Sequence, residues 1–258
     1  MRMTTRYREL IKRPEIAVMV GAYDALSAKL VERAGFDLTF VHDYGVSASL
    51  LGMPDMGVVT LTEMTDILEK VVKAVNIPVI GDGGCGFGNP LNTWRTVREY
   101  ESIGVAGVNL EDQVYPKRCG HLAGKQVVEP AEMVEKIRAA VDARKDPDFV
   151  ITARVDSIAI HGLDDAIKRA NIYVEAGADM IFVEAPTTEA DIQRIINETK
   201  APSWINMVEG GKTPLVPIPK LQQMGAALID YGPLVLFAAA GGVERALQAL
   251  KRDGTSAN

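Results

Sequence analysis

The sequence has 258 residues, of which 47% are hydrophobic and 24% charged, and its formal net charge is -6. This composition supports a large hydrophobic core and is not typical of a disordered chain. The acidic balance and the lack of a long basic run argue against a nucleic-acid partner. Two cysteines are too few for a disulfide framework or a four-cysteine zinc site.

Membrane association is not expected from this sequence. No apolar run reaches the ~20 residues that a membrane-spanning helix needs. The N-terminal stretch MRMTTRYREL lacks the apolar core of a signal peptide. We therefore expect a cytoplasmic protein with no membrane partner.

Short apolar runs alternate with longer segments of helical periodicity along the whole chain. The predicted strands cover residues 16–21, 38–42, 78–82, 107–111, 150–154, 180–184, 203–207 and 227–231. The predicted helices cover residues 24–34, 61–74, 90–103, 130–144, 163–176, 189–199, 217–224 and 234–251. Several helices end at a glycine, which adopts the left-handed cap conformation without steric cost.

The strands are mostly apolar along their whole length, as parallel strands covered on both faces are. Eight such strand–helix units without a break in composition predict an α/β protein with a single (β/α)₈ TIM-barrel domain over residues 1–258. A doubly wound open sheet is the alternative. It is less favoured because no GxGxxG motif follows the first strand.

Polar side chains gather at the predicted carboxyl ends of the strands, where TIM barrels carry their active sites. The five that converge are Asp82, Glu111, Arg154, Glu184 and Asn206. Carboxylate oxygens completed by water are the ligands that Mg²⁺ prefers. The guanidinium of Arg154 can bind a substrate carboxylate through two parallel hydrogen bonds.

A cationic loop follows the fourth strand and carries Lys117, Arg118, Cys119 and His121. Neighbouring cations favour the thiolate form of a cysteine and bring its pKa toward neutrality, where the group can give or take a proton. The loop could equally bind an anion through its charge alone, with the cysteine incidental. The residues themselves leave both interpretations open.

The motifs KRCGH at 117–121 and LEDQ at 110–113 together resemble the isocitrate lyase/phosphoenolpyruvate mutase superfamily. The KRCGH form is similar to the lyase branch, which includes methylisocitrate and dimethylmalate lyases. The similarity extends over nearly the whole chain and includes GAYDA at 21–25, LGMPDMG at 51–57 and GFGN at 86–89.

The resemblance implies a Mg²⁺-dependent barrel, with Mn²⁺ as a substitute, that cleaves a carbon–carbon bond in a small substituted 2-hydroxy di- or tricarboxylic acid. The metal would stabilise the enolate of a 2-oxo acid. By position, Asp82 would be the direct metal ligand, and Glu111 and Asp55 would hold metal-bound waters. Cys119 would be the general acid.

The remaining roles implied by the resemblance concern the substrate. Arg154 would bind a substrate carboxylate, and Glu184, Asn206 and His121 would line the pocket. Lys117 and Arg118 would add positive charge for the carboxylates. The resemblance also implies a homo-oligomer, a tetramer or a dimer.

The sequence departs from the family pattern at three places. The family's Asp-Ala-Asp appears here as Asp82-Gly83-Gly84, so the second carboxylate is missing. The stretch His42-Asp43-Tyr44-Gly45 replaces a small Ser/Thr-Gly stretch, and we expect His42, Asp43 and Gly45 to contact substrate and the Tyr44 phenol to take part in catalysis. Residues 252–258 stand where family members continue with a further helix, often exchanged between subunits, so we expect the barrel without it.

Three functions remain open from the sequence. The first is a carbon–carbon lyase. The second is a decarboxylase or hydrolase of an oxaloacetate-like 2-oxo acid, which the same metal–enolate chemistry allows. The third is a non-catalytic barrel that binds a small acid, for which Gly84 is the main support.

Overall fold

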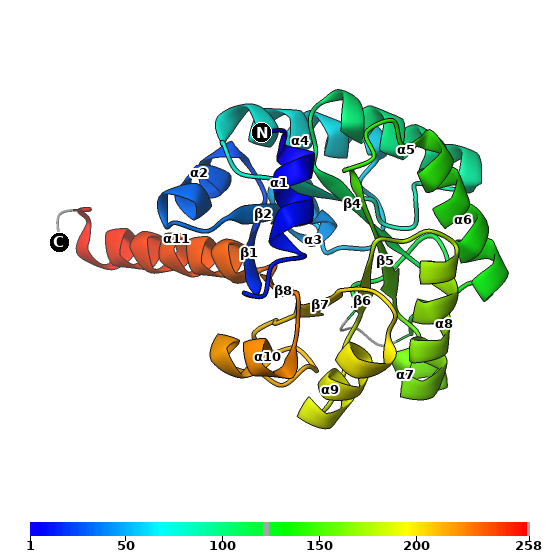
Figure 1. The fold of residues 1–258 in the computed structure, drawn as a ribbon. Helices are drawn as coiled ribbons and strands as arrows, with labels where there is room; N and C mark the ends of the chain where they lie inside the picture. The colour runs from blue at the N-terminus through cyan, green and yellow to red at the C-terminus, as the bar shows by residue number, and fades with distance from the viewer. Residues whose placement is uncertain (121–123, 257–258) are drawn as a thin grey trace.

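The computed structural model describes residues 1–120 and 124–256, which form a closed barrel of parallel strands (Figure 1). The strands are β1 (Ala17–Ala22), β2 (Leu38–Val41), β3 (Val79–Asp82), β4 (Gly107–Glu111), β5 (Val150–Val155), β6 (Met180–Val183), β7 (Ser203–Asn206) and β8 (Leu228–Tyr231). Strand β1 pairs with both β2 and β8, which closes the sheet. The predicted TIM barrel is confirmed, and the open-sheet alternative is wrong.

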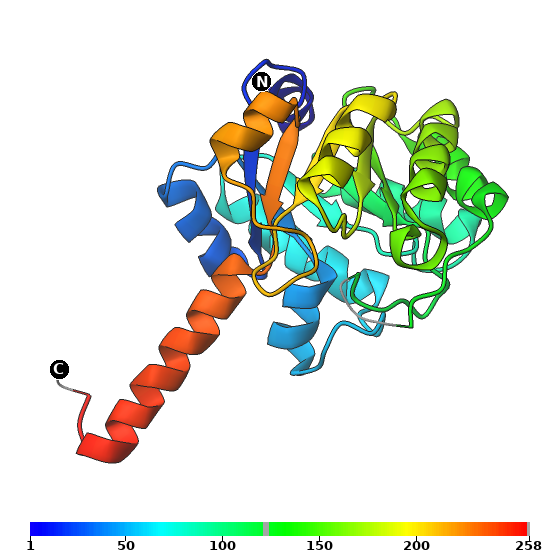
Figure 2. The same cartoon turned by 90° about the horizontal axis from the view of Figure 1, so that it is seen from below.

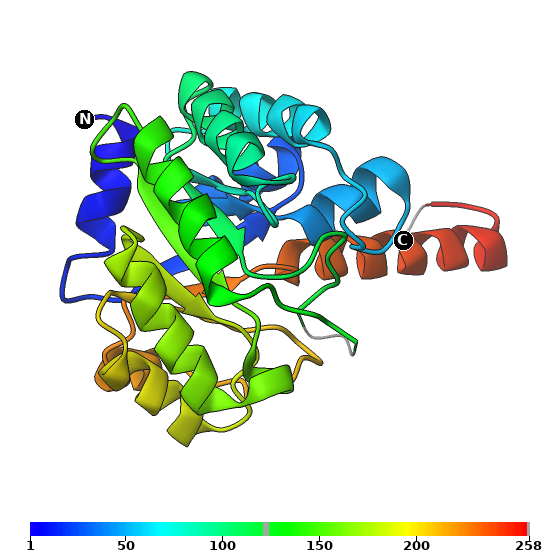
Figure 3. The same cartoon turned by 90° about the vertical axis from the view of Figure 1, so that its right-hand side faces the viewer.

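Helices follow the strands and lie on the outside of the barrel. They are α2 (Ala25–Arg33), α4 (Leu61–Ala74), α5 (Pro90–Ser102), α6 (Pro130–Ala143), α8 (Leu163–Glu175), α9 (Glu189–Glu198), α10 (Ile218–Met224) and α11 (Leu234–Asp253). Figure 3 shows α5, α6 and α8 side by side over the strands. Each of these eight helices matches a segment predicted from periodicity.

Local sequence signals explain where several helices begin. At the start of α4, the Thr60 hydroxyl accepts from the Glu63 backbone N–H, and the Glu63 carboxylate accepts from the Thr60 backbone N–H. This reciprocal pair satisfies donors that the first helical turn leaves without partners. Helix α5 begins with Asn89 as its cap and Pro90 at the first helical position, where a missing N–H costs nothing.

One helix that the sequence did not predict closes the N-terminal end of the barrel. Helix α1 (Met3–Leu10) buries Tyr7 and Leu10 against the barrel's inner residues, which include Met19. The Tyr7 hydroxyl donates a hydrogen bond to the sulfur of Met180 at 3.6 Å. Three short helical segments, α3 (Asp43–Val46), η1 (Ser47–Leu51) and α7 (Ile158–His161), are also absent from the prediction.

An aromatic layer lies inside the barrel beneath its C-terminal end. The ring of Trp204 stacks on Phe182 with centroids 4.9 Å apart and meets Phe40 edge-on at 5.0 Å. Phe182 and Trp204 are buried, so they separate the packed lower interior from the cavity above. Ring pairs of this geometry stabilise a core beyond the effect of area burial alone.

The C-terminal helix α11 runs away from the barrel (Figure 2). None of its residues is buried, although Val243, Leu247 and Leu250 are apolar and share one helical face. No helix within the described ranges is both long and apolar enough to cross a bilayer.

Candidate active site

A cavity of about 370 Å³ opens at the C-terminal end of the barrel. It lies where active sites of this fold are found. Nine of the residues singled out from sequence line it: His42, Tyr44, Asp55, Asp82, Lys117, Cys119, Arg154, Glu184 and Asn206. The structure therefore brings together side chains from most of the predicted strand ends and from the KRCGH loop.

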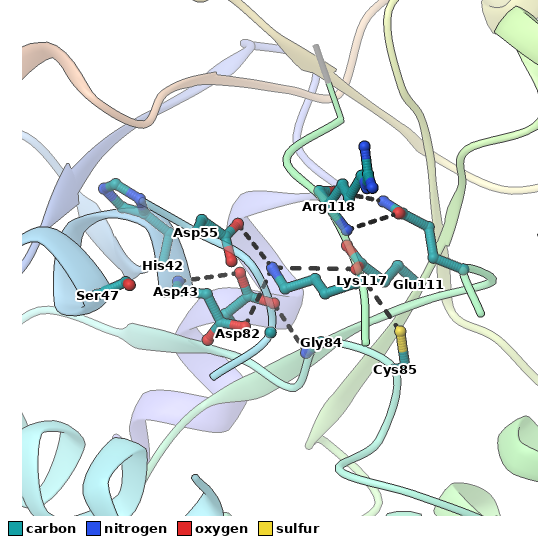
Figure 4. A network of polar contacts seen from close by, with 12 residues as sticks. His42, Asp43, Ser47, Asp55, Asp82, Gly84, Cys85, Glu111, Lys117 and Arg118 are labelled. Carbon is teal, nitrogen blue, oxygen red and sulfur yellow. Dashed lines mark hydrogen bonds and ion pairs between the residues drawn. The ribbon is translucent and has the colours of Figure 1, made fainter. Parts of the chain in front are cut away.

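The ammonium of Lys117 lies at the centre of a buried carboxylate cluster, which we define as Asp43, Asp55, Asp82 and Glu111 (Figure 4). Its Nζ is 2.9 Å from Asp55 Oδ2, 3.1 Å from Asp43 Oδ2 and 3.9 Å from Glu111 Oε1. The Lys117 side chain is only 4% exposed. The ammonium of Lys117 thus points toward the carboxylate cluster. The sequence alone did not predict this contact.

Four carboxyl groups surround the single ammonium of Lys117. Burial raises the pKa of Asp43 to about 8 and that of Glu111 to about 8, despite the nearby ammonium. Burial alone would lower the pKa of Lys117, but the surrounding carboxylates raise it well above its usual value. Lys117 therefore stays charged at neutral pH, and its charge opposes the rise that burial causes in the pKa of Asp43 and Glu111.

The Asp82 carboxylate is fixed by two backbone groups. Its Oδ1 accepts a hydrogen bond from the Gly84 N–H at 3.0 Å, and its Oδ2 accepts one from the Asp43 N–H at 3.2 Å. The Tyr100 hydroxyl donates to the Asp82 carbonyl at 2.6 Å. These contacts orient the side chain at the end of β3 and bring the loops after β2 and β3 together.

The donor chemistry of the carboxylate cluster fits Mg²⁺. Carboxylate oxygens are the ligands this ion takes, and it keeps several waters in most protein sites. Lys117 Nζ marks a point that three of these carboxylates already share as a cation position. Across residues 1–120 and 124–256, no group of three or more protein donors is arranged to enclose an ion directly. Waters and substrate oxygens would have to complete the coordination.

The guanidinium of Arg154 is held in place by neighbouring carboxylates. Its Nε donates to Asp156 Oδ2 at 2.8 Å, and its Nη2 lies 2.9 Å from Glu184 Oε2. The group also lies over the Phe182 ring, with its central carbon 4.9 Å from the centroid. Lys125 Nζ, 2.7 Å from Asp156 Oδ1, helps Arg154 to lower the pKa of Asp156 against the effect of burial. Arg154 is thus oriented before any substrate binds.

The KRCGH loop touches Arg154 and Glu184 through Gly120. A Cβ at Gly120 would lie 2.2 Å from Arg154 Nη2 and 2.6 Å from Glu184 Cγ. A glycine is required here because no other side chain fits at this approach. The loop places Cys119, which is half-buried, on the cavity wall. His121, predicted to line the pocket, lies outside the described residues.

The second cysteine has a packing role. Cys85 is buried, and its Sγ lies 3.7 Å from Glu111 Oε1. Burial raises the pKa of the Cys85 thiol far above its usual value. It therefore stays a neutral thiol and differs in this respect from a reactive cysteine.

His42 is buried and neutral. Burial lowers the pKa of His42 to about 4, and its Nδ1 accepts a hydrogen bond from the Gly45 N–H at 3.1 Å. A Cβ at Gly45 would lie 3.0 Å from the His42 ring, so the small residue is needed for packing. The Tyr44 ring stacks on His42 at 6.3 Å and also lines the cavity. Burial raises the pKa of the Tyr44 phenol.

Four predicted residues lie off the cavity wall. Asp43, Glu111 and Gly45 stand behind it, the first two in contact with Lys117. Arg118 borders a separate hollow, where its backbone N–H donates to Gln113 Oε1 at 3.1 Å. The roles of all four in substrate or metal binding remain predictions.

Asp230 on β8 is a site residue that the sequence interpretation missed. It lines the cavity and is buried, and burial raises its pKa well above the usual value for a carboxyl group. Its neighbour Tyr231, the predicted polar end of this strand, does not line the cavity. Alternation along β8 could have identified Asp230, because Leu228 also points inward.

The chain matches the family model described as phosphoenolpyruvate phosphomutase over residues 7–251. It is 45% identical over 257 residues to 2,3-dimethylmalate lyase of Eubacterium barkeri, covering 100% of this chain and 89% of the relative. It is 40% identical over 248 residues to 2-methylisocitrate lyase of Aeropyrum pernix, covering 96% and 80%. The chain therefore belongs to the phosphoenolpyruvate mutase/isocitrate lyase superfamily.

Solved structures agree with this assignment. Oxaloacetate acetylhydrolase bound to 3,3-difluorooxalacetate superposes with a TM-score of 0.95 at 32% identity, over 99% of this chain and 89% of that one. Phosphonopyruvate hydrolase with oxalate and Mg²⁺ gives 0.89 at 29% identity, over 98% and 88%. The predicted family is confirmed. The named relatives bear out the expected enzyme class, a carbon–carbon lyase, over a non-catalytic barrel.

Proposed function

We propose that this chain is a Mg²⁺-dependent carbon–carbon lyase acting on a small substituted 2-hydroxy di- or tricarboxylic acid. The observation that carries the proposal is the arrangement of the cavity. Asp55 and Asp82 of the carboxylate cluster line it together with the oriented guanidinium of Arg154, and Cys119 lies on the loop that touches Arg154. The 45% identity to 2,3-dimethylmalate lyase supports the same chemistry.

Arg154 and Asn206 both line the cavity and can bind the substrate. Arg154, held by Asp156 and Glu184, binds one substrate carboxylate without losing further side-chain freedom. The Asn206 side chain offers a second contact, since its buried Oδ1 has no hydrogen-bond partner among the described residues. Asp82 would be the direct ligand of Mg²⁺, and Asp55 and Glu111 would hold its waters. When bound, the ion stabilises negative charge that develops on substrate oxygen.

Cys119 supplies the proton that completes the cleavage. The bond between the hydroxyl-bearing carbon and its neighbour breaks, and the electron pair passes to the neighbouring carbon. The hydroxyl gives its proton to the carboxylate of Glu184, which lines the cavity beside Arg154, and becomes the carbonyl of a 2-oxo acid. The Cys119 thiol gives its proton to the new carbanion, which leaves as a carboxylic acid. Tyr44, whose phenol stays protonated, lies beside this loop.

A substrate panel followed by proton NMR tests the proposal. The panel contains 2,3-dimethylmalate, 2-methylisocitrate, citramalate, isocitrate and oxaloacetate, each with Mg²⁺ and with EDTA. We expect two acids from one substrate with Mg²⁺ and none with EDTA. Cys119→Ala should reduce turnover by about 10²–10⁴-fold, the usual contribution of a positioned acid. Cys85→Ala is the matched control for loss of a thiol. Cleavage at the wild-type rate in EDTA, or in Cys119→Ala, contradicts the mechanism.

A hydrolase of an oxaloacetate-like acid is the second candidate. The TM-score of 0.95 with oxaloacetate acetylhydrolase supports it. The two candidates differ in product: the hydrolase consumes water and releases two acids from oxaloacetate, whereas the lyase forms a 2-oxo acid from a 2-hydroxy acid. The same NMR spectra distinguish them.

We also propose that the chain forms a homo-oligomer. The apolar face of α11, made of Val243, Leu247 and Leu250, is exposed and lies apart from the barrel. A second copy of this chain is the occupant we propose for it. No nucleic-acid or membrane partner is proposed, in keeping with the net charge of -6.

A further inference from the structure

A side chain at position 84 would lie close to the Asp43 carboxyl group, although the two residues belong to different loops. Gly84 stands two positions after Asp82, where the resemblance to the superfamily implies an acidic residue. A Cβ built on Gly84 would lie 3.3 Å from Asp43 Oδ2 and 3.8 Å from Lys117 Cε. A side chain at position 84 would therefore point to the place where the Asp43 carboxylate already lies.

The Asp43 carboxylate is built into the site. The residue is 4% exposed, its Oδ2 is 3.1 Å from Lys117 Nζ, and its backbone N–H donates to Asp82 Oδ2. Its second oxygen, Oδ1, is buried and has no hydrogen-bond partner among the described residues. A buried carboxylate oxygen without a donor is costly unless something binds it.

We propose that Asp43 supplies the second carboxylate of the metal site, in place of an acidic side chain at position 84. This inference rests on the proposed function and assigns a residue to its Mg²⁺ site. The sequence interpretation placed Asp43 against the substrate. The structure instead points to a carboxyl group supplied from the loop after β2, beside Asp82 and Lys117.

The backbone permits the exchange to be reversed. Gly84 has φ of 47°, in the left-handed region, which aspartate tolerates better than most residues. In otherwise wild-type protein, an aspartate introduced at position 84 would meet the Asp43 carboxyl group at close range. Removal of the Asp43 carboxylate makes room for it. A double substitution can therefore restore the carboxylate that a single substitution removes.

The test is Mn²⁺ affinity, measured by electron paramagnetic resonance of free Mn²⁺ in the absence of substrate. The variants are Asp43→Asn, Asp43→Ala, Gly84→Asp and the double Asp43→Ala/Gly84→Asp. Asp142→Asn, which removes a surface charge that accepts from Trp94, is the control for net charge. Thermal melts accompany each titration.

We expect Asp43→Asn and Asp43→Ala to weaken Mn²⁺ binding by about 10–100-fold, the usual cost of losing a group that supports metal ligands. The double variant should regain most of this affinity. Such recovery is a non-additive effect, which independent residues far apart do not show. Asp142→Asn should bind as wild type does. Gly84→Asp alone should melt at a lower temperature in EDTA, because it places two carboxylates together.

Two results would overturn the assignment. One is Mn²⁺ affinity unchanged within about twofold in Asp43→Asn, which would reduce Asp43 to a structural partner of Lys117. The other is no recovery in a folded double variant. Neither result depends on turnover. A wild-type protein that binds Mn²⁺ through Asp43 but cleaves no acid would keep this inference and contradict the proposed lyase.

Discussion

Lys117 Nζ lies 2.9 Å from Asp55 Oδ2, with both side chains buried, and this pair joins the KRCGH loop to the loop after β2. Two further carboxylates, Asp43 and Glu111, lie within 4 Å of the same ammonium. Removing one partner of a buried ion pair leaves uncompensated charge in a medium that solvates it poorly.

We therefore expect Lys117→Met to lower the free energy of unfolding by about 3–5 kcal/mol, the usual cost of breaking a buried ion pair. Urea denaturation at pH 7.5 measures it. Lys73→Met is the control, because Lys73 pairs with Glu69 on the surface and such pairs contribute about 0–1 kcal/mol. Equal losses in the two variants would contradict the central place of Lys117.

The lowered pKa of His42 predicts that the stability of the fold depends on pH. Its pKa is about 4 in the folded chain and 6.5 in an unfolded one, so between these values the unfolded state binds the proton and the folded state does not. Stability contributed by neutral His42 is therefore present above pH 6.5 and is lost as the pH falls toward 4.

We expect wild type to lose up to about 3 kcal/mol through this group between pH 7 and pH 4. His42→Gln should flatten that slope in denaturation curves measured across the range. His161→Gln is the control, since His161 is exposed on α7. The same slope in wild type and His42→Gln would show that His42 titrates normally.

Gly120→Ala should lower turnover and leave stability almost unchanged. A methyl group there would overlap Arg154 Nη2 and Glu184, so the loop must move outward and carry Cys119 with it. A displacement of this size commonly costs about 10²-fold in rate. Steady-state kinetics measure it. Gly242→Ala is the matched control, because a Cβ there meets only an exposed arginine side chain at 4.0 Å. If kcat is unchanged in Gly120→Ala, the close approach of Gly120 to Arg154 and Glu184 is not needed for catalysis.

The exposed face of α11 predicts a change in assembly. Leu247→Glu combined with Val243→Glu should reduce the mass measured by size-exclusion chromatography with light scattering, because an interface cannot bury two unpaired charges. Gln248→Glu, a polar substitution one position away, should keep the wild-type mass. Wild type that already runs as a monomer would contradict the proposed oligomer.

The barrel was predictable because its strands are almost uniformly apolar and its helices are periodic. Helix α1 was not, since Met3–Leu10 is largely polar and its role depends on where Tyr7 reaches inside the closed sheet. Tertiary packing, which periodicity does not encode, decides such a segment.

The sequence predicted which residues form the candidate site, but it did not predict how they contact one another. The strand ends indicated Asp82, Arg154 and Glu184, which do line the cavity. The direction of Lys117 could not be predicted, because a lysine in a cationic loop can equally face solvent, substrate or buried carboxylates. The approach of Asp43 to Gly84 joins the loops that follow the neighbouring strands β2 and β3, and no spacing within either loop predicts it.

The layer formed by Phe40, Phe182 and Trp204 separates two regions of the barrel that have different roles. Below it, α1 and the inner residues around Met19 carry stability. Above it, loops such as residues 208–211 shape the cavity without supporting the core. Substitutions in those loops can therefore change which acid is accepted while the fold stays intact. The two ends of this chain's barrel are free to evolve, or to be engineered, at different rates.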